Sequence, residues 1–390
     1  MKKLNIMAAM MVGLLAFASC DSDRDDNPIL TVPESFNLLK PEIADNVIDL
    51  ENSSAIQFMA EKAPNYSFPT ETTYWMQVTG EDNANFADAD KVYSLSSTSN
   101  SITYNAPTNE VDLCVMKIKG WDDAAQVEKT TPVTINVRMV ACPKNLNDSA
   151  NYVYSSVQQI KVYPYFIKES LPKFWYITGS IIGNDGCTWK NDPAFFGTGM
   201  QPMYVKKGAE YDKFTGDGVV EWIGYLAAGG TIKFIEPKGL TNWNYSLSGG
   251  TINAKGGSGF KYRSGGDDPG NTTVEDAGYY TIDINTKSLS MTVKPYTDPV
   301  TTYTSVKIGD NEMAAVNTCA GMENHDWFAT ITLGTKTNMV FTANDGTTWG
   351  SSIFPCAIGN VKGSNIPCDK GTYKVFFNDI TGAYSFVEQK

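Results

Sequence analysis

Along most of the chain, apolar residues occur in short runs that alternate with polar residues and end at glycine, proline, asparagine or aspartate. Alternation with a period of two is typical of a β-strand that buries one face. No stretch keeps the 3.6-residue period of an amphipathic helix over several turns. We therefore predict an all-β protein built from β-sandwiches.

The first block of this pattern, residues 33–165, has the strand spacing of an immunoglobulin-like sandwich. Its predicted strands are residues 55–60, 73–79, 101–105, 111–119, 133–140 and 158–163. Two proline-containing segments, residues 163–172 and 294–299, follow as predicted linkers, because proline cannot donate a hydrogen bond to a β-ladder. These linkers divide the rest of the chain into residues 171–296 and 301–390.

The same pattern occurs once in each of these two segments. The first copy opens with FWYITGS and the second with TSVKIGD, and each closes with an aromatic hairpin. The matched residues are Trp222 with Trp327, Phe234 with Phe341, Trp243 with Trp349, and Tyr280 with Tyr373. Two copies in register predict one β-sandwich fold that is used twice. The first copy is longer because of loops at residues 183–218 and 249–275, where function is expected.

The amino terminus has the pattern of an export signal. Lys2 and Lys3 precede an apolar run, residues 6–18, which is too short to span a bilayer because a span needs about 20 residues. We predict a signal peptide over residues 1–19. Phe17-Ala18-Ser19-Cys20 is similar to a bacterial lipobox, which implies acylation of Cys20. The acidic tether, residues 20–32, resembles a signal for the outer face of the outer membrane; a solvated linker is the alternative.

Charge and residue counts exclude several classes of function. The net charge of -12 repels nucleic acid, so no nucleic-acid partner is expected. The single histidine, His325, is predicted in a surface loop, and its isolation disfavours histidine-based catalysis. No Cys/His spacing indicates a metal site, and no cofactor is expected. Two pairs of cysteines are near enough in sequence to form disulfides, Cys114 with Cys142 and Cys356 with Cys368; free buried thiols are the alternative.

The candidate chemistry is the recognition of sugar rings. A pyranose has an apolar face of C–H groups edged by hydroxyls, so its site needs a flat aromatic surface and a few polar groups. Trp189 and Trp243 lie in polar loops, and Asn242 precedes Trp243. Lys233 precedes Phe234 on a predicted strand and should point outward if Phe234 points inward. Trp349 fits a shared site or shared packing, whereas Trp222 and Trp327 are predicted core residues.

Three segments, FWYITGS, TIKFIEPKGLTNWNYS and NMVFTANDGTTWGSS, carry a resemblance to a known family together with the lipobox and the acidic tether. The chain resembles the SusE and SusF type of starch-utilisation-system outer-membrane lipoproteins. The resemblance implies an immunoglobulin-like domain and two carbohydrate-binding-module-like sandwiches. It also implies binding of starch or another polysaccharide or oligosaccharide without cleavage, beside a TonB-dependent transporter and other surface glycan-binding lipoproteins.

The resemblance assigns the site to particular residues of the first copy. Trp189, Lys233 and Trp243 match the positions that hold sugar in the family. In the second copy Val340 aligns with Lys233 and no tryptophan corresponds to Trp189, which leaves glycan binding by that copy open. Two other functions also remain open: a glycosidase that uses loop carboxylates, and a structural or adhesin subunit without a sugar site.

Overall fold

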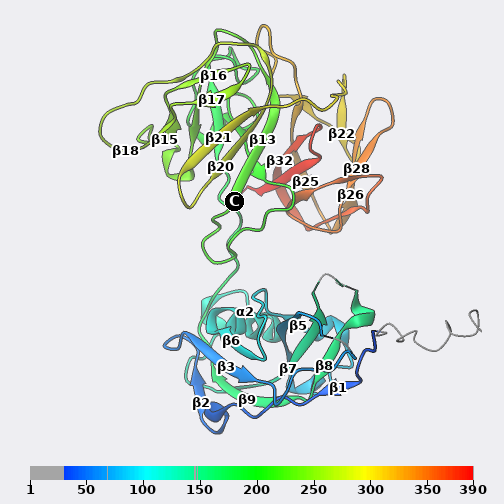
Figure 1. The fold of residues 1–390 in the computed structure, drawn as a ribbon. Coiled ribbons are helices and arrows are strands. Elements are labelled where there is room, and N and C mark those ends of the chain that lie inside the picture. Colours follow the sequence, from blue (N-terminus) through cyan, green and yellow to red (C-terminus); the bar gives the residue numbers. More distant parts are fainter. Residues whose placement is uncertain (1–29, 68, 145, 147, 390) are drawn as a thin grey trace, which may run out of the picture. The chain divides into compact units, whose positions relative to one another are not determined.

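The computed structural model of the chain describes residues 30–67, 69–144, 146 and 148–389. These residues form two compact units, one that ends at Glu169 and one that spans Ser170–Lys390 (Figure 1). β-Sheets dominate both units, which confirms the predicted all-β class of sandwich domains. The predicted signal peptide and Cys20 lie outside the described residues.

The first unit is built on a seven-stranded sheet. Strand alternation explains the core of this unit: in β3 (Ala55–Met59), which lies outside the seven-stranded sheet, every second residue, Ile56 and Phe58, is buried. The central strands, in spatial order, are β1 (Ser35–Phe36), β8 (Val153–Ser155), β7 (Val133–Pro143), β4 (Thr72–Gly80) and β5 (Tyr93–Ser94). The remaining strands are β2 (Val47–Asp49), which pairs with β9 (Gln158–Tyr163), and the separate pair β3 (Ala55–Met59) and β6 (Thr103–Pro107).

One predicted strand of this unit, residues 111–119, is wrong. The segment belongs to helix α2 (Thr108–Lys119), which buries Val111 and Val115 against the sheet. Gly120 ends the helix in the left-handed region at φ 65°, where its N–H reaches the last carbonyls. A short apolar run shows both periods equally well, so only this C-terminal glycine signal could have identified the helix.

The second unit contains the two copies of the repeat, and each copy forms two sheets. In the first copy, Trp175, Trp222 and Phe234 fill the space between the sheets. One sheet has the order β11 (Gln201–Pro202), β10 (Tyr176–Gly179), β14 (Thr231–Ile235), β19 (Thr272–Val274), β16 (Thr251–Asn253) and β17 (Gly256–Ser258), with β15 (Tyr245–Ser248) between β14 and β18 (Lys261–Ser264). The other has the order β12 (Tyr204–Val205), β13 (Val219–Leu226), β20 (Gly278–Asn285) and β21 (Ser290–Pro295).

The second copy is more compact, and its core contains Trp327, Phe341 and Trp349. One sheet has the order β23 (Asn311–Glu312), β22 (Val306–Ile308), β27 (Phe341–Ala343), β28 (Thr348–Gly350) and β30 (Asn360–Val361). The facing sheet has the order β24 (Ala314–Ala315), β25 (Asp326–Leu333), β32 (Gly371–Asn378), β33 (Ala383–Glu388) and β29 (Cys356–Ile358). A further pair joins β26 (Thr337–Met339) and β31 (Ile366–Cys368).

Strand pairing corrects two of the four residue matches between the copies. Phe234 lies opposite Leu247 and its counterpart Phe341 lies opposite Trp349, so Trp349 corresponds to Leu247 and not to Trp243. The last residue of β13, Leu226, lies opposite Gly278, and the last residue of β25, Leu333, lies opposite Gly371. Leu226 and Leu333 are therefore equivalent. Trp222, four residues before Leu226, then corresponds to Ala329. Matching by residue type therefore paired tryptophans that are not equivalent. Trp327 lies two residues before the true counterpart of Trp222, and Trp243 lies four residues before that of Trp349.

The two copies are joined covalently, by a disulfide between Cys187 and Cys319. The pairs that the sequence suggested are wrong, since none of their four members is in a disulfide: Cys114, Cys142, Cys356 and Cys368. The observed cysteines are 132 residues apart and lie in different sandwiches. Proximity in sequence gave no sign of this pairing, because sandwich contacts join residues that are distant along the chain.

Candidate functional site

Two tryptophans from separate loops meet at one edge of the first sandwich. Trp189 follows β10 and Trp243 precedes β15, and their ring centroids are 6.1 Å apart with an interplanar angle of 72°. Both side chains are half-buried. Part of each indole therefore stays open to solvent, and the structure brings together the two loop tryptophans that the sequence singled out.

Hydrogen bonds hold the part of the Trp189 loop that follows the indole. On its carboxyl side, the Lys190 N–H donates to the buried Thr178 hydroxyl of β10 at 3.1 Å. Asp192 then caps the short 3-10 helix η6 (Pro193–Phe195) by accepting from the Ala194 N–H at 2.8 Å. These bonds fix the backbone beside Trp189.

The Trp243 loop is fixed to the Trp189 loop through Asn191. The Thr241 N–H donates to the Asn191 carbonyl at 2.7 Å. With its side-chain oxygen directed at this loop, Asn191 also accepts from the Asn242 N–H and from Trp243 Nε1, both at 3.3 Å. Asn191 thereby sets the position of one indole relative to the other.

Each of the two loops contains a non-glycine residue in the left-handed region, Cys187 at φ 49° and Thr241 at φ 63°. Such a conformation is unfavourable for a β-branched residue such as threonine, and it persists only where the surroundings hold it. Backbone of this kind is common at binding sites. The loops are therefore ordered structures and not flexible connections.

Asn242 lies next to Trp243 and its side chain is exposed. Its Oδ1 accepts from the Asn244 N–H at 3.2 Å, in an Asx turn that leads into β15. Asn242 therefore supplies an exposed amide next to Trp243 in the chain.

Lys233 lies on the outward face of β14, as alternation predicts, but it is not an exposed donor. Only 5% of the residue is accessible, and Nζ contacts both carboxylate oxygens of Asp268 at 2.8 and 2.9 Å. Arg263 reaches the same carboxylate at 3.3 Å. The ion pair with Lys233 lowers the pKa of Asp268. The outward direction does not expose the Lys233 ammonium group, because the loop after β18 covers this part of the sheet.

Trp349 does not join the indole pair. It is 4% exposed and packs between Tyr303 and Phe377 in the core of the second sandwich. A sugar needs an accessible indole face, so we correct the assignment of Trp349 from a site residue to a core residue. The reason is the register: Trp349 takes the place of Leu247, which faces the core in the first copy.

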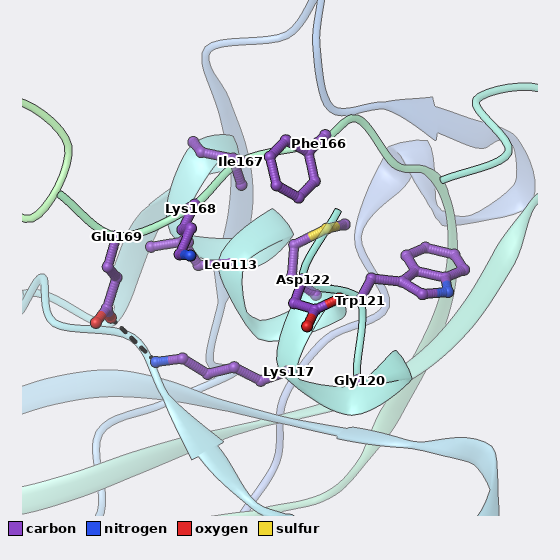
Figure 2. Close-up of a pocket in the computed structure, with 10 residues that line it drawn as sticks. Leu113, Lys117, Gly120, Trp121, Asp122, Phe166, Ile167, Lys168 and Glu169 are labelled. Carbon is purple, nitrogen blue, oxygen red and sulfur yellow. Dashed lines mark hydrogen bonds and ion pairs between the residues drawn. The ribbon is translucent and has the colours of Figure 1, made fainter. Parts of the chain in front are cut away.

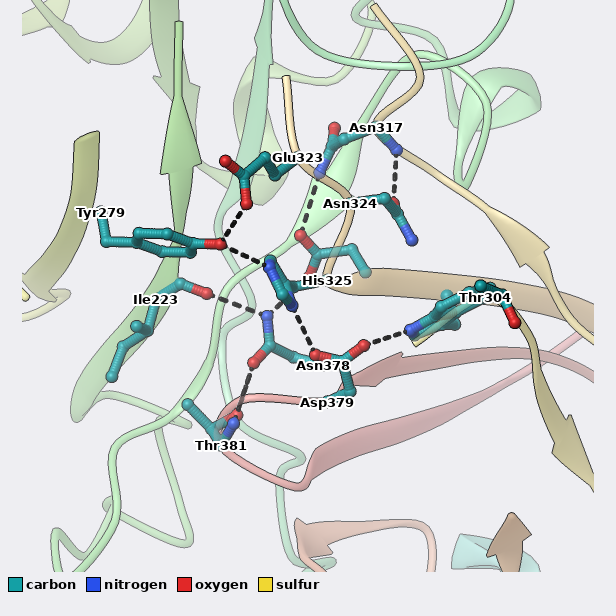
Figure 3. A network of polar contacts seen from close by, with 12 residues as sticks. Ile223, Tyr279, Thr304, Asn317, Glu323, Asn324, His325, Asn378, Asp379 and Thr381 are labelled. Carbon is teal, nitrogen blue, oxygen red and sulfur yellow. Dashed lines mark hydrogen bonds and ion pairs between the residues drawn. The ribbon is translucent and has the colours of Figure 1, made fainter. Parts of the chain in front are cut away.

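His325 is not a surface residue, as the sequence suggested, but is 1% exposed between the two sandwiches (Figure 3). Its ring lies between the Tyr279 hydroxyl, at 2.9 Å, and the Asp379 carboxylate, at 2.7 Å. Trp327 donates to the other oxygen of Asp379 at 2.7 Å. The polar residues around His325 in the sequence suggested exposure to solvent. In the structure, buried polar side chains satisfy one another's hydrogen bonds around His325.

Asp326 is the centre of a second buried cluster between the sandwiches. Its carboxylate accepts from Trp222 Nε1 and from the side-chain amides of Asn317 and Asn378, each at 3.0 Å. Trp222 comes from the first copy and the two asparagines come from the second. Burial raises the pKa of Asp326 to about 6, against the effect of these donors. Sequence reasoning missed this cluster because its members are spread over more than one hundred residues.

A pair of carboxylates was also missed. Glu221 on β13 lies opposite Asp283 on β20, and Lys206 bridges them at 3.1 and 2.5 Å. Burial raises the pKa of Glu221. The acids of this pair lie on strands and not in the loops, and Lys206 compensates their charge.

The first unit contains a pocket of about 350 Å³ beside the end of helix α2 (Figure 2). Leu113, Trp121 and Phe166 give it an apolar lining, and an ion pair between Lys117 and Glu169 at 3.0 Å lies at its rim. This pocket lies in a different unit from the indole pair. Trp121 thus offers a comparison tryptophan for tests of the indole pair.

Two further properties concern the described residues alone. No group of three or more His, Cys, Asp and Glu side chains among them is arranged to hold a metal ion. In the same part of the chain, no helix has the length and apolar character needed to cross a bilayer.

Comparisons with known proteins give a distant likeness. No protein-family model matches the chain. The crystal structure of SusF from Bacteroides thetaiotaomicron is similar at 10% sequence identity, over 91% of this chain and 76% of that one, with a TM-score of 0.23. We therefore base the function on the residues of the site.

Proposed function

We propose that this chain is a non-catalytic glycan-binding protein and that Trp189 and Trp243 form its binding surface. The observation that carries this proposal is the meeting of two partly exposed indoles from separate, ordered loops. Indole faces bind the C–H face of a pyranose, and Asn242 beside them supplies a hydrogen-bonding amide. In this proposal Lys233 acts indirectly, by holding Asp268 in the loop after β18.

The proposed setting is the exterior of the outer membrane, with Cys20 acylated and the acidic tether leading to the first unit. The sequence features of residues 1–32 support this location. A surface protein that retains polysaccharide would serve a TonB-dependent transporter and other glycan-binding lipoproteins beside it. The glycan, starch or another polysaccharide, is the first unknown to determine.

Affinity electrophoresis of the chain without residues 1–19 tests the proposal. The gels contain amylopectin, pullulan, dextran, xylan or laminarin, and we expect at least one of them to retard the protein. Trp243→Ala should weaken that binding by roughly 30-fold, because an aromatic anchor commonly contributes about 2 kcal/mol. Trp189→Ala should act in the same direction.

Trp121→Ala is the matched control, since it removes a partly buried indole from the other unit and should leave retardation unchanged. Circular dichroism checks that each variant is folded. Normal binding by both Trp189→Ala and Trp243→Ala would exclude the indole pair as the site. A reducing-end assay on the same polysaccharides tests the glycosidase alternative, and sustained turnover would overturn the non-catalytic assignment.

A further inference from the structure

The loop that carries Trp189 is fastened to the second sandwich. Cys187 forms the disulfide with Cys319 and stands two residues before Trp189. Three residues after Cys187, the Lys190 N–H is bonded to Thr178 of the first sandwich. Trp189 therefore lies between two anchors, one on each sandwich.

Hydrogen bonds reinforce the anchor on the second sandwich. Asn184 Nδ2 donates to the Ala315 carbonyl at 2.7 Å, and the Thr318 N–H donates to the Gly183 carbonyl at 3.1 Å. One of these hydrogen bonds is donated by the loop and the other by the second sandwich. The Trp189 loop is thus docked along residues 315–319 and not merely linked at one sulfur.

Residues 315–319 are themselves rigidly held. The Val316 N–H donates to the Asp326 carbonyl at 2.9 Å. Asn317 is buried, and its Nδ2 reaches Asp326 at 3.0 Å and Gln201 of the first sandwich at 2.7 Å. The disulfide therefore joins the loop to a part of the second sandwich that the buried Asp326 cluster keeps in place.

We propose that the second sandwich is a positioning element of the glycan site: through Cys187–Cys319 and Asn184 it fixes Trp189 relative to Trp243. This inference rests on the proposed function of the indole pair. A loop that is ordered before binding avoids the entropy cost of being ordered by the ligand. The second sandwich contributes to binding in this way although its own tryptophan, Trp349, is buried in the core.

The first test needs no ligand. In the chain without residues 1–19, Cys187→Ser/Cys319→Ser should raise amide hydrogen–deuterium exchange in residues 183–191 and 315–319. Exchange in β15 and β18, which lie beyond the Trp243 loop, should stay unchanged. The matched control is Cys356→Ser, which removes a free thiol from the second sandwich. Unchanged exchange in residues 183–191 would overturn the inference whether or not the protein binds glycan.

The second test uses the polysaccharide from the panel that retards the wild-type chain. Cys187→Ser/Cys319→Ser should weaken binding roughly threefold to tenfold by loss of preorganisation. Asn184→Ala, which keeps the disulfide, should weaken it less. In a Trp189→Ala background, the cysteine substitutions should have no further effect, because the positioned group is already gone.

These outcomes separate the two proposals. Full affinity in a folded Cys187→Ser/Cys319→Ser variant would reject the positioning role and leave glycan binding intact. An equal loss with and without Trp189 would show general destabilisation instead of positioning, and would also reject it. Absence of retardation by every polysaccharide would reject the proposed function, while hydrogen exchange still decides whether the second sandwich orders the loop. If the cysteine variant does not fold, Asn184→Ala decides both tests.

Discussion

The two sandwiches of the second unit share a strand register but use their tryptophans differently. At the position opposite the central phenylalanine, the first copy has Leu247 and the second has Trp349, and both residues are buried. The first copy places Trp243 four residues earlier, in a loop outside the register. Position relative to the register, and not residue type, therefore separates a core tryptophan from a surface tryptophan.

Loop length accounts for the rest of the difference. The first copy places residues 180–200 between β10 and β11, where the second has residues 309–310 between β22 and β23. Residues 236–244 join β14 to β15, whereas residues 344–347 join β27 to β28. The first copy alone has enough chain at this edge to build two indole-bearing loops, and the second copy supplies a surface on which one of them rests.

The largest expected effect is that of Trp349→Ala on stability. Removal of a fully buried tryptophan typically costs about 3–5 kcal/mol. Urea unfolding of the second unit, followed by tryptophan fluorescence, measures the change. Glycan binding in the variant that remains folded should equal that of the wild type.

Trp243→Ala is the converse variant. Its indole is half-buried and its edge-to-face contact with Trp189 contributes only about 1 kcal/mol, so stability should change little while binding weakens by roughly 30-fold. If instead Trp349→Ala weakens binding without affecting unfolding, the assignment of the two tryptophans is reversed.

The next prediction concerns how the stability of the folded protein depends on pH through Asp326, which lies buried between the two copies. Burial raises the pKa of Asp326 from 3.8 to about 6, so the folded protein binds a proton that the unfolded chain releases between these values. Stability therefore falls as pH rises through this window, by roughly 3 kcal/mol from this group. Urea unfolding between pH 4.5 and 7 should show the stability of wild type falling relative to Asp326→Asn, which does not titrate.

Asp310→Asn is the control for this experiment, because Asp310 is an exposed residue of the same sandwich. Its unfolding profile over the same pH range is the reference for a carboxyl-to-amide change on the surface of the sandwich. If the stability of wild type relative to Asp326→Asn stays constant or rises as pH increases, the raised pKa of Asp326 is contradicted.

Particular residues show how far the sequence predicts this molecule. Strand alternation predicted the sandwiches and the outward direction of Lys233, and polar context placed Trp189 and Trp243 in loops, where the structure has them. Sequence could not predict that Asp268 covers Lys233 or that Asn191 joins the two loops, because both contacts depend on tertiary loop geometry. The same holds for His325, Asp326 and the disulfide, each of which depends on a partner in the other sandwich.

The smallest expected effect is that of Lys233→Val, which gives the first copy the residue that stands at position 340 in the second. The ion pair with Asp268 is buried on the lysine side only, because 46% of the Asp268 side chain is accessible. After the substitution, water and Arg263 can still solvate that carboxylate. We therefore expect a loss of about 1 kcal/mol in stability.

Binding by Lys233→Val then decides the role of this residue in the site. If Lys233 acts only by holding Asp268, affinity for the retained polysaccharide should fall less than about threefold, which is under 1 kcal/mol. Lys261→Val, on strand β18 of the same sheet, is the matched control because that lysine is exposed. A tenfold or greater loss in folded Lys233→Val, with Lys261→Val unchanged, would mean that the Asp268 loop opens during binding and that the Lys233 ammonium group contacts the sugar directly.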